Sequence, residues 1–163
     1  MEIRLANTED LDEIMEIYRI ARQFMKDHGN ERQWGLRQWP PRELIEKDIA
    51  ERKSYVCMQE NEIVGVFYYD YGKDVEPTYR NIEGEWKDPS PYGVVHRIAS
   101  KQSVKGVGTF CINYAFEKSG HLRIDTHADN YVMQNLLKKL GFEYCGIIYV
   151  YEDHDPRYAY EKN

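Results

Sequence analysis

The sequence has 163 residues, of which 42% are hydrophobic and 31% are charged, and its formal net charge is −6. This length and mixture predict a folded single domain over residues 1–163 rather than a disordered chain. No apolar run approaches the roughly 20 residues that span a bilayer, and the acidic balance argues against general nucleic-acid binding, so we expect a cytoplasmic protein without membrane or nucleic-acid partners.

The first part of the chain alternates between strand and helix patterns. The predicted elements are a strand at residues 2–6, a helix from Thr8 to about His28, a helix at 42–53 and strands at 54–59 and 62–71. Thr8 is followed by two acids and is the expected N-cap of the first helix, and Glu60-Asn61 is the expected hairpin turn. Trp34 and Trp39 lie in the loop between the two helices, where they either line an acceptor pocket or pack against the core.

A polar stretch at residues 72–91, which we call the 72–91 insertion, separates these strands from an apolar run at 92–99. Pro77, Gly84 and Pro89 break it, so no long helix or strand is expected there. Long ordered loops often carry function, so the insertion is either a lid over a substrate or a passive surface loop.

A strand, a glycine-bearing turn and a helix follow one another directly from Val94 onward. Gly106 and Gly108 lie where the helical pattern begins, and Lys105 stands beside them. The first amides of a helix have no intrahelical acceptor and carry the positive end of its dipole, and glycine lets a ligand approach the backbone. This combination indicates a phosphate site, although a simple tight turn would show the same two glycines.

The charge is unevenly distributed along the chain. Residues 96–141 contain seven Lys or Arg and three Asp or Glu, a net of +4, so the remainder carries −10. A basic segment within an acidic chain suits an anionic cofactor at one site and a cationic acceptor at another.

The last third of the chain predicts a strand at 121–127, a helix that begins after Asp129-Asn130 and ends at Gly141, and two closing strands. These strands are expected at 142–151 and 157–161, with a turn at 153–156 between them. The three cysteines, Cys57, Cys111 and Cys145, each lie in an apolar stretch without paired spacing and are interpreted as buried thiols.

The order of these features resembles the GNAT superfamily of N-acetyltransferases. Its acetyl-CoA site combines a Q/R-x-x-G-x-G/A loop with a strand, an Asn and a helix that ends in Gly-Phe. The matching residues here are Gly106, Gly108, Asn130, Gly141 and Phe142. The resemblance spans residues 94–150 and implies a GNAT-like acyl-CoA N-acyltransferase fold of the α/β (α+β) class. Helices would flank a mixed central sheet, in which the parallel strands 92–99 and 121–127 splay apart.

The resemblance also implies acetyl-CoA as co-substrate and no metal. Backbone amides at residues 104–109 would bind its pyrophosphate with help from Lys105, and the splayed strand would hold its pantetheine arm. The residues assigned to cofactor binding are Ile98, Ala99, Val104, Lys105, Gly106, Val107, Gly108, Thr109, Asn130 and Lys139. For Asn130, a simple helix N-cap is the alternative role.

Four positions depart from the family pattern, and one of them is Met133, which replaces an Ala in the last helix. Ser103 stands where Gln or Arg is usual in the loop. Leu137 stands where the family usually has the Tyr that protonates the departing thiolate, and Tyr92 stands where the histone-acetylating branch has its general base Glu. These departures leave the catalytic acid and base open.

His96 is the first candidate to take the proton of the amine, because an unperturbed imidazole titrates near neutrality. If the strand alternates regularly, His96 shares one face with Tyr92 and Ile98. Tyr92 remains a second catalytic candidate on that face, and Tyr131 could protonate the thiolate in place of the missing Tyr. A structural histidine is the alternative for His96.

The predicted function is acetyl transfer from acetyl-CoA to a primary amine of a small molecule or peptide. The alternative is a catalytically weak domain of the same fold that binds CoA as a sensor or serves as an interaction module. Asp125, His127 and His96 do not have the spacing of a closed zinc site, and Cys111 lies on a buried helix stripe, which disfavours a cysteine hydrolase. A monomer and a homodimer are both compatible with the sequence.

Overall fold

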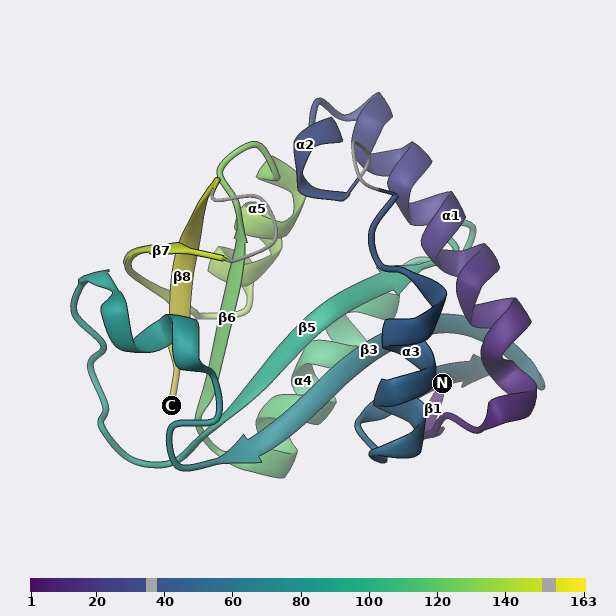
Figure 1. Cartoon of the computed structure of the whole chain (residues 1–163), viewed down its shortest axis with the longest axis horizontal. Coiled ribbons are helices and arrows are strands. Elements are labelled where there is room, and N and C mark those ends of the chain that lie inside the picture. Colours follow the sequence, from purple (N-terminus) through teal and green to yellow (C-terminus); the bar gives the residue numbers. More distant parts are fainter. Residues whose placement is uncertain (35–37, 151–154) are drawn as a thin grey trace.

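The computed structural model describes residues 1–34, 38–150 and 155–163, in which helices cover both faces of one eight-stranded sheet (Figure 1). The strands are β1 (Glu2–Leu5), β2 (Ser54–Gln59), β3 (Glu62–Gly72), β4 (Glu83–Gly84), β5 (Tyr92–Ser100), β6 (Leu122–His127), β7 (Glu143–Tyr149) and β8 (Pro156–Lys162). The helices are α1 (Leu11–Asp27), α2 (Glu31–Trp34), α3 (Arg42–Ala50), α4 (Val107–Ser119) and α5 (Tyr131–Lys139), with short 3-10 helices η1 (Thr8–Asp10) and η3 (Pro77–Asn81).

The sheet is mixed, and its strand order is β1-β2-β3-β5-β6-β8-β7-β4. Every neighbouring pair is antiparallel except β5 and β6, which are parallel and are connected through α4. β5 and β6 pair only at Gly93 with Leu122 and at Val94 with Arg123, and beyond Val94 they diverge. The predicted fold class and the splayed parallel pair are therefore confirmed.

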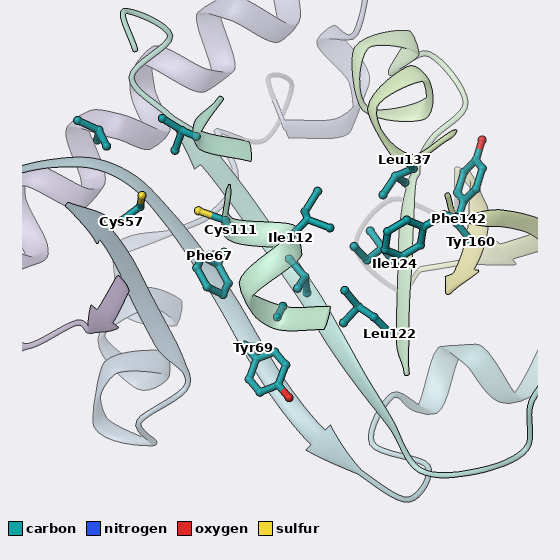
Figure 2. Close-up of a cluster of buried hydrophobic side chains, with 14 residues drawn as sticks. Cys57, Phe67, Tyr69, Cys111, Ile112, Leu122, Ile124, Leu137, Phe142 and Tyr160 are labelled. Carbon is teal, nitrogen blue, oxygen red and sulfur yellow. The ribbon is translucent and has the colours of Figure 1, made fainter. Parts of the chain in front are cut away.

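Three groups of buried side chains hold the layers together. The largest lies between the sheet and the helices α4 and α5 and contains Phe67, Cys111, Ile112, Leu137 and Phe142 (Figure 2). A second lies on the opposite face, where α1 and α3 pack on β2 and β3. The third joins η3 to β5, β7 and β8. All three cysteines are free and buried, as the sequence predicted.

Most element boundaries agree with the sequence, and two differ for local reasons. Asn7, not Thr8, caps the first helical turn, because its side chain accepts from the Glu9 N–H while the Asp10 carboxylate accepts from the Asn7 N–H. Helix α3, which was predicted at 42–53, ends at Ala50, because Arg52 takes the left-handed conformation with φ of +60°.

The predicted hairpin turn is confirmed. Glu60 and Asn61 both have positive φ, of +51° and +64°, as a two-residue turn between twisted strands requires. The turn predicted at 153–156 and the end of the strand predicted at 142–151 fall mainly on residues 151–154, which lie outside the described residues.

The 72–91 insertion is an ordered part of the sheet layer, which its polar composition did not predict. It contains η3 and the two-residue strand β4, which pairs with β7 at the sheet edge. Tyr79 of η3 is 1% exposed, and Trp86 packs on its ring. In Figure 1 the insertion crosses in front of β6 and β8, on the same side of the sheet as α1 and α3. Within the described residues no helix has the length and apolar character to cross a membrane.

Candidate functional site

Two cavities meet where β5 and β6 diverge. The larger, which we call the α4 groove, has a volume of about 470 Å³ and runs between α1, the N-terminus of α4 and α5. The smaller, which we call the His96 cavity, has a volume of about 180 Å³ and lies between β5, β6, the 72–91 insertion and the loop after α1. Met25, Ile98, Asn130 and Met133 line both, so the two cavities are neighbours with a common wall.

The α4 groove ends at a helix N-terminus whose first amides are available to a ligand. Gly106 is the N-cap of α4 with φ of +80°, and no side chain within the described part of the chain caps this turn. The first helical bond runs from the Phe110 N–H to the Gly106 carbonyl, so the amides of residues 107–109 precede it. A Cβ on Gly106 would meet nothing within 4 Å, so glycine is needed there for its positive φ rather than for lack of space.

Most of the residues predicted to bind the cofactor line this groove. They are Ile98, Ala99, Val104, Lys105, Gly106, Val107, Gly108, Thr109 and Asn130. Tyr131 lies at its rim and is 64% exposed. Lys139, at the far end of α5, is the one predicted cofactor residue outside the groove lining.

Asn130 has two protein partners. Its Oδ1 accepts from the Met133 N–H at 3.0 Å, which makes it the N-cap of α5, and its Nδ2 donates to Gln33 Oε1 at 3.1 Å. The Gln33 contact ties the N-terminus of α5 to α2 at the wall that both cavities share. The N-cap role that the sequence left open is therefore present, and cofactor contact by Asn130 stays a prediction.

A β-bulge in β5 shapes the junction of the cavities. Arg97 and Ile98 together stand opposite Phe67 of β3, because Tyr68 pairs with His96 and Val66 pairs with Ala99. Arg97 has φ of +51°. The bulge reverses the alternation of side chains, so Ile98 packs with the α4 core while His96 faces the opposite side. The expectation that Ile98 shares the face of His96 is wrong for this reason.

His96 lies between two carboxylates in the smaller cavity. Its Nε2 is 3.2 Å from Glu76 Oε2, and its Nδ1 is 3.9 Å from Asp125 Oδ2. Thr78 Oγ1 donates to Glu76 Oε1 at 2.7 Å. Burial alone would raise the pKa of Glu76, but its hydrogen bonds with His96 and Thr78 and the charge of His96 lower that pKa to about 2. Glu76 is therefore a carboxylate at neutral pH.

The 72–91 insertion brings Glu76 to His96. The Tyr79 hydroxyl donates to Asp125 Oδ2 at 2.7 Å, and Trp86 Nε1 donates to the Tyr79 carbonyl at 2.9 Å. Burial and the Asp125 carboxylate raise the pKa of Tyr79 well above its usual range, so the phenol remains a donor. The insertion is thus fastened beside β6, and one of its acids becomes part of the site.

Tyr92 is buried outside both cavities. It is 3% exposed, its hydroxyl accepts from the Glu76 N–H at 3.3 Å, and the Arg123 guanidinium lies 4.1 Å from its ring centre. Trp86 covers the other side of Arg123 at 4.2 Å. Tyr92 therefore supports the backbone of Glu76, and a catalytic role for Tyr92 stays a prediction.

Aromatic and hydroxyl groups complete the His96 cavity. Trp34 and Trp39 both line it, and Trp34 also packs edge-on against Tyr18 in the core, while binding of an acceptor by these side chains stays a prediction. Thr126 lines the cavity as well and is 1% exposed, and its hydroxyl has no hydrogen-bond partner among the described residues. Neither Glu76 nor Thr126 could be recognised from the sequence, because no motif surrounds them.

The other chemistry-bearing residues singled out in the sequence lie elsewhere. His127 Nε2 is 2.9 Å from Asp155 Oδ2, and its Nδ1 accepts from the Asp129 N–H, so it does not join His96. Across the described ranges, no group of His, Cys, Asp or Glu side chains is arranged to hold a metal ion. Cys111 is 0% exposed, and the hydrogen bond with Cys57 and burial raise the pKa of its thiol well above its usual range, which disfavours a nucleophilic role.

The fold is a mixed sheet with one splayed parallel pair. A glycine turn at a helix N-terminus lies beside the splay, and an acid–histidine cavity lies next to it. Together these features define an acyltransferase domain. An acetyltransferase of the GNAT family from Streptococcus agalactiae is 31% identical, with 99% of this chain and 94% of that chain covered and a TM-score of 0.87. The chain therefore belongs to the GNAT family of acetyltransferases.

Two further solved structures are similar over the full chain. A candidate acetyltransferase from Staphylococcus aureus is 28% identical, with 100% of this chain and 99% of that chain covered and a TM-score of 0.73. A GNAT-family acetyltransferase from Listeria monocytogenes is 17% identical, with 99% and 93% covered and a TM-score of 0.72, and supports the fold alone. The sequence matches no protein-family model and no curated protein.

Proposed function

We propose that the protein is an acetyl-CoA-dependent N-acetyltransferase that acts on a primary amine of a small molecule. The observation that carries this proposal is the junction of the two cavities at Ile98, with helix amides at the far end of one and His96 in the other. One cavity suits a long anionic donor and the other a small cationic acceptor.

The α4 groove suits the cofactor by its donor groups and by its course from the N-terminus of α4 to Ile98. The amides of residues 107–109 and the Lys105 ammonium suit a pyrophosphate at the N-terminus of α4. From there the groove continues past Ala99 to Ile98, where β5 has left its partner strand and can bind an extended arm. The bound cofactor supplies the thioester, an activated acyl donor. Lys139 is not included in this site.

The His96 cavity suits a small amine. Its volume of about 180 Å³ is well below the 470 Å³ of the α4 groove, which suits a compact group. The Glu76 carboxylate attracts the amine as an ammonium ion, and Trp34 and Trp39 contribute aromatic side chains to the lining, which suit a cation. A small molecule is therefore favoured over a folded protein surface as the acceptor.

His96 takes the proton that the ammonium must lose before attack, directly or through a water. The amine nitrogen then forms a bond to the acyl carbon, and the carbon–sulfur bond breaks. The nitrogen releases its second proton to water, which leaves a neutral amide, and the thiolate receives a proton from water or from Tyr131. A thiolate with a pKa near 8 to 9 leaves without a strong acid, so Leu137, which is fully buried, can replace the usual Tyr. Glu76 and Asp125 hold the imidazole in place on both sides.

The test is thiol release from acetyl-CoA with a panel of small amines across pH. His96→Ala is expected to lower turnover by about a hundredfold or less, chiefly at low pH where an unaided amine is protonated. His121→Ala is the matched control, because His121 also bonds a glutamate, Glu161 at 2.8 Å, but lies outside both cavities.

His121→Ala should lower the melting temperature and leave the pH profile of turnover unchanged. An unchanged profile in His96→Ala would contradict the role of His96. CoA binding by calorimetry without thiol release for any amine would instead favour the second candidate function, a CoA-binding sensor.

A further inference from the structure

The bulge of β5 holds a non-glycine residue in a conformation that the backbone disfavours. Arg97 has φ of +51°, in the left-handed region, although it lies within a strand. A side chain other than Gly, Asn or Asp is uncommon there and persists only where its surroundings impose it. The contacts of Arg97 should therefore show what imposes this conformation.

Three groups from three elements bind Arg97, and two of them, Asp48 and Tyr18, are buried. Asp48 of α3 accepts two hydrogen bonds from its guanidinium, both at 3.0 Å. The Tyr18 hydroxyl of α1 donates to the Arg97 carbonyl at 2.7 Å, and the Tyr68 ring of β3 lies 4.5 Å from the guanidinium carbon. Tyr18 is 1% exposed and Asp48 is 3% exposed, so both contacts are buried in the core and not on the surface.

This arrangement is a poor choice for stability alone. Burying an ion pair costs desolvation that its attraction seldom exceeds, and an apolar pair of the same volume is often as stable. Burial raises the pKa of Asp48 although Arg97 opposes this change, so the carboxylate carries that cost. Burial also raises the pKa of Tyr18, which keeps its hydroxyl a donor throughout the physiological range. Since the buried pair adds little net stability, its benefit is that it fixes the backbone of Arg97 in one conformation.

The conformation fixed in this way lies at the junction of the two cavities. Arg97 lines the His96 cavity, Ile98 lines both, and Ala99 lines the α4 groove. The carbonyl and the N–H of one trans peptide point in opposite directions, so the bond from Tyr18 also fixes the direction of the Ile98 N–H. His96, the next residue before the bulge, is aimed by the same segment.

We propose that Asp48 and Tyr18 are positioning residues, which hold the Arg97–Ile98 peptide in its bulged conformation and so align the acyl donor with His96. This inference rests on the proposed function. Neither residue touches the reacting atoms. Their effect passes through the backbone at Arg97, and a misplacement of about 1 Å at a reacting centre can lower the rate by about a hundredfold.

The decisive experiment compares two double variants that lack the ion pair, Arg97→Gly/Asp48→Asn and Arg97→Ala/Asp48→Asn. Both lose the same charges and the same contact with Tyr68, but only glycine adopts a positive φ without strain. We expect kcat to be about tenfold higher in the glycine variant than in the alanine variant, with a smaller difference in the KM for acetyl-CoA. Equal kcat values in the two variants would overturn the proposal.

Two single variants complete the set. Tyr18→Phe should lower kcat by about tenfold with little change in the KM for acetyl-CoA, since it removes the bond to the carbonyl and keeps the ring. Asp10→Asn is the control, because Asp10 makes the same two-bond contact with Arg4, at 2.7 and 3.0 Å, outside both cavities. It should lower stability and leave kcat unchanged.

A measurement without substrate separates this proposal from the proposed function. The amide NMR shifts of Ile98 and Ala99 in the free protein should stay near their wild-type values in the glycine double variant and move in the alanine one. If wild type acetylated no amine, the proposed function would fail while this readout still decided whether the contacts hold the bulge. Identical shifts in both double variants would overturn the inference.

Discussion

The α4 groove and the His96 cavity share Ile98 but are built in different ways. The groove takes most of its lining from two short stretches, residues 98–109 and 130–136, and binds through backbone amides at the N-terminus of α4. The cavity brings together side chains from β5, β6, the 72–91 insertion and the loop after α1, which are far apart in the chain. The groove depends on backbone conformation, and the cavity depends on side-chain chemistry.

This difference predicts how each region responds to mutation. In the groove, a change of φ should matter more than a change of charge, because amides make the contacts. In the cavity, a change of one functional group at constant shape should matter, because single side chains make the contacts. The four variants below test this contrast, from the largest expected effect to the smallest.

Gly106→Val should weaken CoA binding at least about a hundredfold in calorimetry, because displaced amides lose two or more charge-assisted hydrogen bonds. Gly120→Val is the matched control, since Gly120 caps the other end of α4 with φ of +70° and a Cβ there also meets nothing within 4 Å. Both variants should lose similar stability. Equal affinity for CoA in both would place the cofactor elsewhere.

Glu76→Gln should remove a stabilisation that depends on pH. The pKa of Glu76 is lowered from 4.5 to about 2 in the folded protein, so its ionised form stabilises the fold above about pH 4.5. The advantage of wild type over the variant, on the order of 2 kcal/mol, should shrink as the pH falls from 4.5 towards 2.

Urea unfolding at pH 7, 4.5 and 3 measures this difference. Glu117→Gln, at an exposed position on α4, serves as the control and should change the free energy of unfolding little at any pH. A difference between wild type and Glu76→Gln that stayed constant from pH 7 to pH 3 would show that His96 and Thr78 do not favour the ionised form.

Thr126→Val should separate binding from stability in the His96 cavity. Since the buried Thr126 hydroxyl has no partner among the described residues, its removal should leave stability unchanged or raise it by up to about 1 kcal/mol. The KM for the amine should rise about tenfold if the acceptor bonds this hydroxyl. Thr126→Ser keeps the hydroxyl and should retain the wild-type KM, so equal KM values for the Val and Ser variants would contradict the contact.

Lys105→Ala should have the smallest effect, about a threefold loss of CoA affinity, because one mobile exposed charge adds little to amide contacts. The loss should diminish at high salt. Lys118→Ala, near the opposite end of α4, should change nothing. A loss as large as that of Gly106→Val would mean that charge, rather than the backbone, binds the pyrophosphate.

The groove was predictable from the sequence because its determinants are local. Positive φ at Gly106 needs glycine, a helix start is marked by its pattern, and the two lie next to each other in the chain. The strand before them and the helix after Asn130 are likewise set by short-range periodicity. Residues far from the turn, such as Lys139, were assigned by resemblance alone, and the structure places that side chain outside the groove lining.

The cavity was predictable only in part. His96 was found because histidine titrates near neutrality, and Trp34 and Trp39 because they are large residues in a loop. Glu76 resembles any other acid in a polar stretch, and its role depends on Tyr79 being buried on Asp125, some 46 positions along the chain. Contacts between residues so far apart in the chain produce no periodic pattern of residues that sequence analysis could detect.

The sequence by itself determined the order of the longer strands and helices, the hairpin at Glu60-Asn61, the crossover from β5 through α4 to β6 and the glycine turn, because neighbouring residues decide each of them. Tertiary structure alone decided where side chains from distant segments meet. The bulge at Arg97 illustrates the reason. Its local backbone preference opposes the observed φ, and only Asp48 and Tyr18, brought in by α3 and α1, impose it and turn Ile98 away from the face of His96.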